Sequence, residues 1–140
     1  MTIRKAKKAE FGRVFTMAHK LWPDYKKSEI FVAKHKFYVA EENDRFIGFI
    51  MLNARRDYVP GSDSSPVGYI EGIFVDEKWR KKGIGRQLVK AAEQWCLDNG
   101  LKELGSDVEP DNKISQDFHS KNGFRKEKLV VPYIKKVQPR

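Results

Sequence analysis

The sequence has very little sulfur and no long apolar segment. Its 140 residues include one cysteine, Cys96, so no internal disulfide can form, and no cluster of metal ligands surrounds it. We interpret Cys96 as a core residue rather than a nucleophile, because buried thiols are usually inert. No apolar run approaches the ~20 residues needed to cross a bilayer, and no segment of signal-peptide type follows the N-terminal charges. The sequence therefore predicts a cytoplasmic protein without a metal site or a membrane partner.

Acidic residues are outnumbered by basic ones. Lys and Arg total 28 against 19 Asp and Glu, a formal charge of +9, which suggests an anionic partner. The basic residues are scattered, without a recognisable nucleic-acid motif. A basic surface with one phosphate site therefore explains them better than nucleic-acid binding. The composition, 40% hydrophobic and 34% charged, is typical of a globular protein, and we expect a single domain over residues 1–140.

A strand, a basic loop and a helix follow one another near the middle of the chain. Residues 73–75 are apolar, and apolar residues recur at helical spacing from residue 84 to residue 95. The first N–H groups of such a helix can bind an anion, glycine lets a ligand approach the backbone, and basic side chains add charge. We predict a pyrophosphate site made by Arg80, Lys81, Lys82, Gly83, Ile84, Gly85 and Arg86.

This loop differs from the two common nucleotide motifs. Arg86-Gln87 follows Gly85 where a P-loop has Lys-Ser/Thr, and the loop lacks the third glycine of the dinucleotide fingerprint. Residues 80–85 instead resemble the Arg/Gln-x-x-Gly-x-Gly/Ala acyl-CoA loop of the GCN5-related N-acetyltransferase (GNAT) superfamily. This resemblance implies acetyl-CoA as cosubstrate.

Periodicity and turn residues predict the other elements. We expect strands at 2–4, 36–41, 46–53, 67–75, 101–106, 124–127 and 129–133, and helices at 9–21, 26–34, 84–98 and from 113 to Gly123, with Ile114 and Phe118 inward in the last. Gly72, inside a strand, indicates a bulge beside a site. The order matches the GNAT fold, an α/β (α+β) architecture with a mixed, mostly antiparallel sheet flanked by about four helices.

Further stretches resemble the bacterial aminoglycoside 6′-N-acetyltransferases within this superfamily. They are Leu21-Trp22-Pro23, Arg56-Asp57-Tyr58-Val59, Asp63-Ser64-Ser65-Pro66, Glu71-Gly72-Ile73-Phe74-Val75, Ser106-Asp107, Pro110-Asp111-Asn112, Ile114-Ser115-Gln116, His119 and Gly123-Phe124. The resemblance implies a small-molecule, polycationic amine as substrate. It also implies a homodimer, since family members use the C-terminal region for dimer contacts. The drug site is expected to include Trp22, Tyr58, Glu71 and Asp107.

A polycationic substrate requires an acidic pocket on this basic protein. Six carboxylates fall in loops or strand ends of the expected cleft: Asp57, Asp63, Glu71, Asp107, Glu109 and Asp111. We interpret Asp111 as a helix cap. Glu71 is different, because a carboxylate in an otherwise apolar strand is costly to bury without a partner.

The resemblance implies direct acetyl transfer to a primary amine. The amine must first lose a proton, since an alkyl ammonium titrates near ~10.4. We assign the proton acceptor, direct or through water, to Glu71, and oxyanion stabilisation to a backbone N–H near Val75. Many superfamily members have a tyrosine as acid where this chain has His119. Tyr58 is the competing candidate for the acid, and His119 is equally well interpreted as a structural histidine.

Acetyl-CoA is expected to lie along the end of strand 67–75. Backbone groups of Phe74 and Val75 would pair with the pantetheine arm like an added strand, and Asn112 and Ser115 would contact the pantetheine or the phosphate. Two alternatives stay open. One is a GNAT enzyme for another amine, such as a polyamine, a peptide N-terminus or a protein lysine. The other is a CoA- or nucleic-acid-binding module without catalysis, whose nucleic-acid affinity would fall steeply with salt.

Overall fold

A five-stranded sheet lies at the centre of the computed structural model, which describes residues 1–128 and 130–138. Its order is β1-β2-β3-β4-β5, with antiparallel pairing throughout except for β5, which is parallel to β4. The strands are β1 (Thr2–Lys5), β2 (Lys36–Glu42), β3 (Arg45–Arg55), β4 (Val67–Val75) and β5 (Leu104–Ser106). The helices are η1 (Lys8–Glu10), α1 (Phe11–Leu21), α2 (Lys27–Ile30), η2 (Glu77–Trp79), α3 (Ile84–Asp98) and α4 (Lys113–Lys121).

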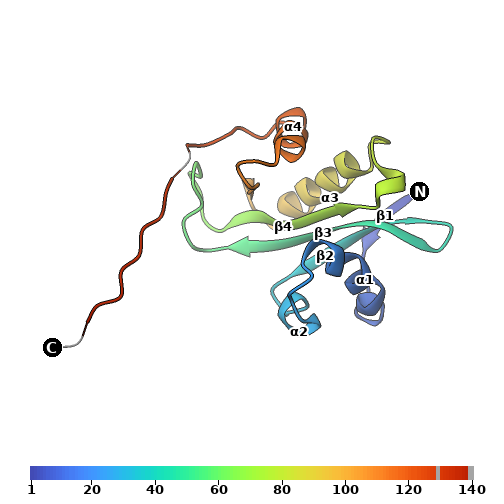
Figure 1. Ribbon diagram of the computed structural model, residues 1–140. Helices are drawn as coiled ribbons and strands as arrows, with labels where there is room; N and C mark the ends of the chain where they lie inside the picture. The colour runs from blue at the N-terminus through green and yellow to red at the C-terminus, as the bar shows by residue number, and fades with distance from the viewer. Residues whose placement is uncertain (129, 139–140) are drawn as a thin grey trace.

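Helices cover both faces of the sheet (Figure 1). Side chains alternate along a strand, so β2 sends Phe37 and Val39 into the core under α1 and α2, and Ala40 into the core under α3. Leu88 and Ala92 of α3 are fully buried in this second core. The mixed sheet with helices on both faces confirms the expected fold class.

The chain departs from regular pairing where β4 passes Glu71. Met51 pairs with Gly72 and Leu52 pairs with Ile70, so Glu71 is the extra residue of a β-bulge. β4 also pairs with β5 only from Gly68 to Ile70. β5 ends at Ser106, so the edge of β4 from Glu71 to Val75 has no further strand paired with it among the described residues. The bulge that Gly72 indicates in the sequence is thereby confirmed.

The predicted strands at the C-terminus are wrong for the residues that the structure describes. Residues 124–128 and 130–138 form no strand, and the latter run away from the domain (Figure 1). Residue 129, the start of the second predicted strand, lies outside the described residues. The β-branched and aromatic side chains that favour a strand are present, but their segment pairs with no other part of residues 1–128 and 130–138. These side chains are exposed: Val130, Val131, Tyr133, Ile134 and Val137.

The last helix also differs from its expected orientation. Phe118 is half-buried against the core under α3, whereas Ile114, one turn earlier, is 85% exposed. Only the C-terminal half of α4 contacts the domain, because residues 111–114 are all exposed. Asn112 caps this helix by accepting a hydrogen bond from the Ser115 N–H at 3.1 Å, so the predicted cap at Asp111 is off by one residue.

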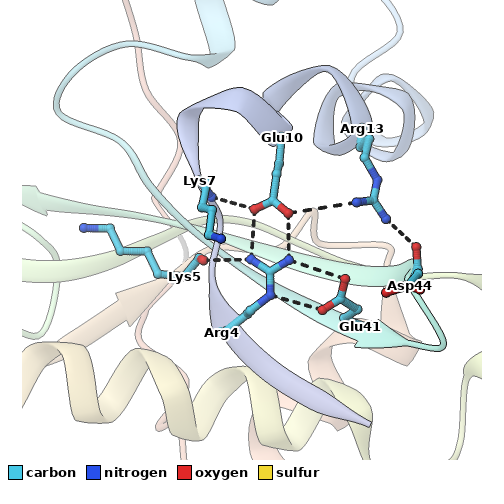
Figure 2. Close-up of polar contacts among 7 residues, drawn as sticks. All are labelled: Arg4, Lys5, Lys7, Glu10, Arg13, Glu41 and Asp44. Atoms are coloured by element: carbon cyan, nitrogen blue, oxygen red, sulfur yellow. Dashed lines mark hydrogen bonds and ion pairs between the residues drawn. The ribbon is translucent and has the colours of Figure 1, made fainter.

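An ion-pair network fastens β1 to η1 and β2 (Figure 2). The Arg4 guanidinium donates to both oxygens of Glu10, at 2.8 and 2.7 Å, and to Glu41 at 3.1 Å. Arg13 stacks on the Phe46 ring and donates to the Asp44 carbonyl at the β2–β3 turn. These contacts lie at the end of β3 opposite Arg55. Across residues 1–128 and 130–138, no helix is both long and apolar enough to span a membrane.

Candidate functional site

Glu71 projects from the bulge into a set of polar side chains. Its carboxylate accepts hydrogen bonds from Arg55 Nη2 at 2.6 Å, Arg55 Nε at 2.8 Å and Asn53 Nδ2 at 3.3 Å. Burial raises the pKa of Glu71, but the hydrogen bonds and charge of Arg55 outweigh it, and the net pKa lies below its usual value. Glu71 is therefore an ionised carboxylate with a partner, as its place in an apolar strand requires.

Tyr69 joins this pair to a second acid. The Arg55 guanidinium lies 3.6 Å from the centre of the Tyr69 ring, and the Tyr69 hydroxyl donates to Asp107 Oδ2 at 2.6 Å. Burial and the Asp107 carboxylate both raise the pKa of Tyr69, so the phenol stays protonated and keeps donating. Glu71, in β4, and Asp107, which directly follows β5, thus belong to one connected cluster.

Trp22 packs on Gly72, the residue that follows Glu71 in β4. A side chain at Gly72 would meet the Trp22 indole at 2.3 Å, so the indole packs directly on the Gly72 backbone. Glycine is required here for close packing, and it brings Trp22 next to Glu71. Tyr58 is not brought into the cluster: its side chain is 78% exposed, and its hydroxyl accepts only a long contact of 3.4 Å from the Gly61 N–H.

His119 contacts the end of β5. Its Nδ1 lies 2.7 Å from the Ser115 carbonyl, which can only accept, so this nitrogen carries a proton. Its Nε2 lies 2.8 Å from the Ser106 hydroxyl. Ser106 pairs with Ile70 at the last rung before β4 and β5 part. Through its contact with Ser106, the imidazole therefore lies near the point where the pairing of β4 with β5 ends.

A cavity of about 660 Å³ adjoins these groups. It lies along β5, between the loop at 59–62 and residues 123–128, and its lining includes Tyr69, Ser106, Asp107 and His119. Glu103 holds the neighbouring loop in place, since it accepts from the Asp63 N–H at 2.8 Å and from the Ser64 hydroxyl. These hydrogen bonds, that of Ser64 first, lower the pKa of Glu103.

The basic loop leads into α3 through a left-handed turn. Gly83 has φ +80° at the N-cap of α3, and a side chain there would meet nothing within 4 Å. The space beside Gly83 is open, and the first N–H groups of a helix lack partners within the helix, a combination that suits a diphosphate. Gly85 also allows close packing, because a side chain there would meet the Phe118 ring of α4 at 2.8 Å. Its predicted place in the pyrophosphate site stays a prediction.

Arg80 is held by the end of β4. Its Nε donates to the Val75 carbonyl at 2.8 Å, and its guanidinium lies 5.7 Å from the centre of the Phe74 ring. Lys81, Lys82 and Arg86 are exposed around the turn. The side chain of Asn112, expected near the cosubstrate, is used in capping α4.

Sequence reasoning missed Arg55, Asn53, Tyr69, Ser106 and Glu103. Asn53 and Arg55 are polar residues two apart at the end of an apolar strand, and so they point to the same face. That alternation, set beside Glu71 in the next strand, is the signal that could have found the ion pair. Cys96 is buried as predicted, and burial raises the pKa of its thiol to about 11, consistent with a core residue.

Known proteins resemble this chain over almost its whole length. The Acetyltransferase (GNAT) family profile matches residues 5–124. The aminoglycoside N(6′)-acetyltransferase type 1 of Salmonella enteritidis is 35% identical over 144 aligned positions, covering 97% of this chain and 99% of the relative. The protein of the same name from Stenotrophomonas maltophilia is 31% identical, covering 99% of this chain and 95% of the relative.

Solved structures agree with this relationship. AAC(6′)-Iy in complex with a bisubstrate analogue, CoA-S-monomethyl-acetylneamine, superposes with a TM-score of 0.89 at 33% identity, covering 97% of this chain and 98% of that one. AAC(6′)-IG from Acinetobacter haemolyticus gives a TM-score of 0.86 at 28% identity, over 99% of this chain and 100% of that one. With its opened sheet, its glycine turn before α3 and these relatives, the chain belongs to the GNAT acetyltransferase family.

Proposed function

We propose that this protein transfers the acetyl group of acetyl-CoA directly to a primary amine of an aminoglycoside, the 6′-amino group. The observation that carries the proposal is the cluster of Glu71 and Asp107, linked through Arg55 and Tyr69, beside the place where β4 and β5 part. An acidic cluster on a protein of formal charge +9 suits a polycationic substrate. Relatives named aminoglycoside N(6′)-acetyltransferases support the same substrate class.

The cosubstrate site proposed here begins at the N-terminus of α3. The N–H groups after Gly83 bind the diphosphate, with Lys81, Lys82 and Arg86 supplying charge around it. The pantetheine arm pairs with the free edge of β4 at Phe74 and Val75, where β5 no longer lies alongside. AAC(6′)-Iy, solved in complex with CoA, supports the cosubstrate assignment by its similarity to this chain.

In the proposed reaction the amine nitrogen attacks the thioester carbonyl, an N–C bond forms and the C–S bond breaks. The proton of the amine leaves through water toward Glu71, whose carboxylate is ionised before the substrate binds because Arg55 offsets the effect of burial. The Val75 N–H stabilises the oxyanion. The thiolate of CoA takes the proton of the Ser106 hydroxyl, which in turn takes the Nε2 proton of a doubly protonated His119 imidazole. Tyr58, exposed and apart from the cluster, is the weaker candidate for this acid.

Release of free CoA across a panel of amines tests the proposed function. We expect kanamycin and tobramycin to give a much larger kcat/KM than spermidine or an N-terminal peptide. A larger value for spermidine or the peptide would identify another amine as the substrate. Absence of CoA release with every amine, together with nucleic-acid affinity that falls steeply with salt, would identify a binding module without catalysis.

A homodimer is also part of the proposal. Val131 and Ile134 lie in a run of exposed apolar side chains at residues 130–137, and a second copy of the chain would bury them. Sedimentation of the whole chain is expected to give a dimer, and Val131→Asp with Ile134→Asp is expected to give a monomer. A wild-type monomer at micromolar concentration would contradict this. We propose that the single domain covers residues 1–140 and acts in the cytoplasm, where acetyl-CoA is available.

A further inference from the structure

The Glu71 carboxylate is largely occupied by the protein itself. A carboxylate offers about four lone-pair positions for hydrogen bonds. Arg55 takes two of them, at 2.6 and 2.8 Å, and Asn53 takes a third at 3.3 Å. An ammonium group brings three N–H donors and a positive charge. It can bind Glu71 fully only if one of these partners withdraws.

Arg55 is the partner that can withdraw. Asn53 is a buried residue, whereas the Arg55 side chain is 38% exposed and extends from the last residue of β3. Its guanidinium rests on the Tyr69 ring, which offers a surface along which the planar group can move without losing its stacking. The Glu71 side chain is only 15% exposed, so it needs a cation whenever no substrate is present.

We propose that Arg55 is a specificity-determining residue, an internal cation that occupies Glu71 until an ammonium group of the substrate displaces it. This inference rests on the proposed function. The free energy of this exchange is close to zero for an amine that carries a positive charge and several donors, because one cation replaces another on the same carboxylate. A neutral amine or a weak donor leaves Arg55 in place. Asp107, which has no basic side chain bonded to it in the described residues, remains for a second ammonium group of the same molecule.

The test compares three variants by calorimetric titration with kanamycin in the absence of acetyl-CoA, and by KM for kanamycin in the CoA-release assay. In Arg55→Gln the competing cation is gone, so we expect Kd and KM to fall by about tenfold or more, the contribution of one hydrogen bond to a charged group. Arg55→Lys keeps a positive charge but loses the two-pronged contact, and its Kd should lie between those of wild type and Arg55→Gln.

The matched control is Arg56→Gln. Arg56 is the next residue and is exposed, and among described residues its side chain forms no hydrogen bond or ion pair, so the variant removes the same charge without touching Glu71. We expect its Kd for kanamycin to stay within about twofold of wild type. An equal gain in affinity for both Gln variants would overturn the inference, since general electrostatics would then be the cause.

Two other outcomes separate this inference from the proposed function. If wild type acetylates kanamycin but Kd and KM rise in both Arg55→Gln and Arg55→Lys, Arg55 positions Glu71 for the substrate, and the displacement inference is wrong. If wild type neither binds nor acetylates kanamycin, the proposed function fails first and the inference fails with it. Thermal unfolding of each variant establishes that it is folded. If Arg55→Gln does not fold, the comparison of Arg55→Lys with wild type tests the inference.

Discussion

The two ends of β3 carry arginine–glutamate clusters of similar chemistry and different completeness. At one end Arg4 donates to Glu10 and Glu41, and with Arg13 the charges balance (Figure 2). At the other end, Glu71 is the one carboxylate that Arg55 pairs with among the described residues. Tyr69 connects Asp107 to this pair, which leaves one cation for two carboxylates. Glu10 and Glu71 are similarly exposed, at 16% and 15%. Charge balance, rather than burial, therefore distinguishes the structural cluster of Arg4, Glu10, Arg13 and Glu41 from the proposed binding cluster of Arg55, Glu71 and Asp107.

The largest effect is expected from removing the charge of Glu71. Glu71→Gln should lower kcat/KM for kanamycin by at least about 100-fold, because it leaves Arg55 unpaired and gives the ammonium no carboxylate. The matched variant at the other end of β3, Glu41→Gln, should change kcat/KM by less than about twofold. Steady-state CoA release measures both. Comparable losses in the two variants would abolish the distinction between the clusters.

A smaller loss is expected for the proposed acid. His119→Ala should lower kcat by about tenfold, whereas Tyr58→Phe should leave kcat unchanged. Ser106→Ala, which removes the hydroxyl at 2.8 Å from His119 Nε2, should reproduce most of the His119 effect. If none of these variants lowers kcat, solvent protonates the thiolate and His119 is a structural residue.

The glycine turn before α3 provides a third test. Gly83→Val should raise KM for acetyl-CoA by about tenfold while KM for kanamycin changes little, because a side chain would enter the space before the helix. Gly100→Val is a matched control, since Gly100 also has a positive φ, +68° against +80°, with nothing within 4 Å of a side chain. Equal stability losses but an unchanged KM in Gly83→Val would contradict the diphosphate assignment.

The smallest effect on activity is expected at the structural cluster around Arg4, where substitutions should change the thermal stability of the protein instead. The hydrogen bond from Arg4 lowers the pKa of Glu10 to about 2. Because the folded pKa lies below the unfolded value of ~4.3, this stabilisation is complete above that value and is lost as the pH falls toward 2. Glu10→Gln should therefore lower Tm by a few degrees at neutral pH and show a flatter decline of Tm in acid. An unchanged acid profile would show that Glu10 does not stabilise the fold.

Much of this arrangement could be predicted from the sequence, for local reasons. The bounds of β4 and the bulge at Glu71 follow from an apolar run interrupted by a carboxylate and a glycine. The positive φ of Gly83 follows from the helix-initiating loop. The pairing of Arg55 with Glu71 could not be predicted in the same way, since it depends on the register between two strands. The orientation of His119 toward Ser106 likewise depends on how α4 meets β5.

The predicted C-terminal strands are elements that local propensity favours but the described residues do not form. Residues 130–134 have strong strand propensity, yet a strand forms only where a partner edge exists, and propensity does not reveal which chain supplies it. Ile114 was expected inward because it lies four residues before Phe118, but α4 contacts the domain only by its second half. Both errors arise from reading a local pattern as if its packing partner were present.

The separation of β4 from β5 after Ile70 has a consequence for the lifetime of the protein. If the pantetheine arm takes the missing place beside β4, the cosubstrate completes the sheet and adds to its resistance to unfolding in proportion to the logarithm of its concentration. Heat tolerance and turnover by proteases would then follow the metabolic state of the cell, with well-fed cells retaining more of the enzyme than starved ones.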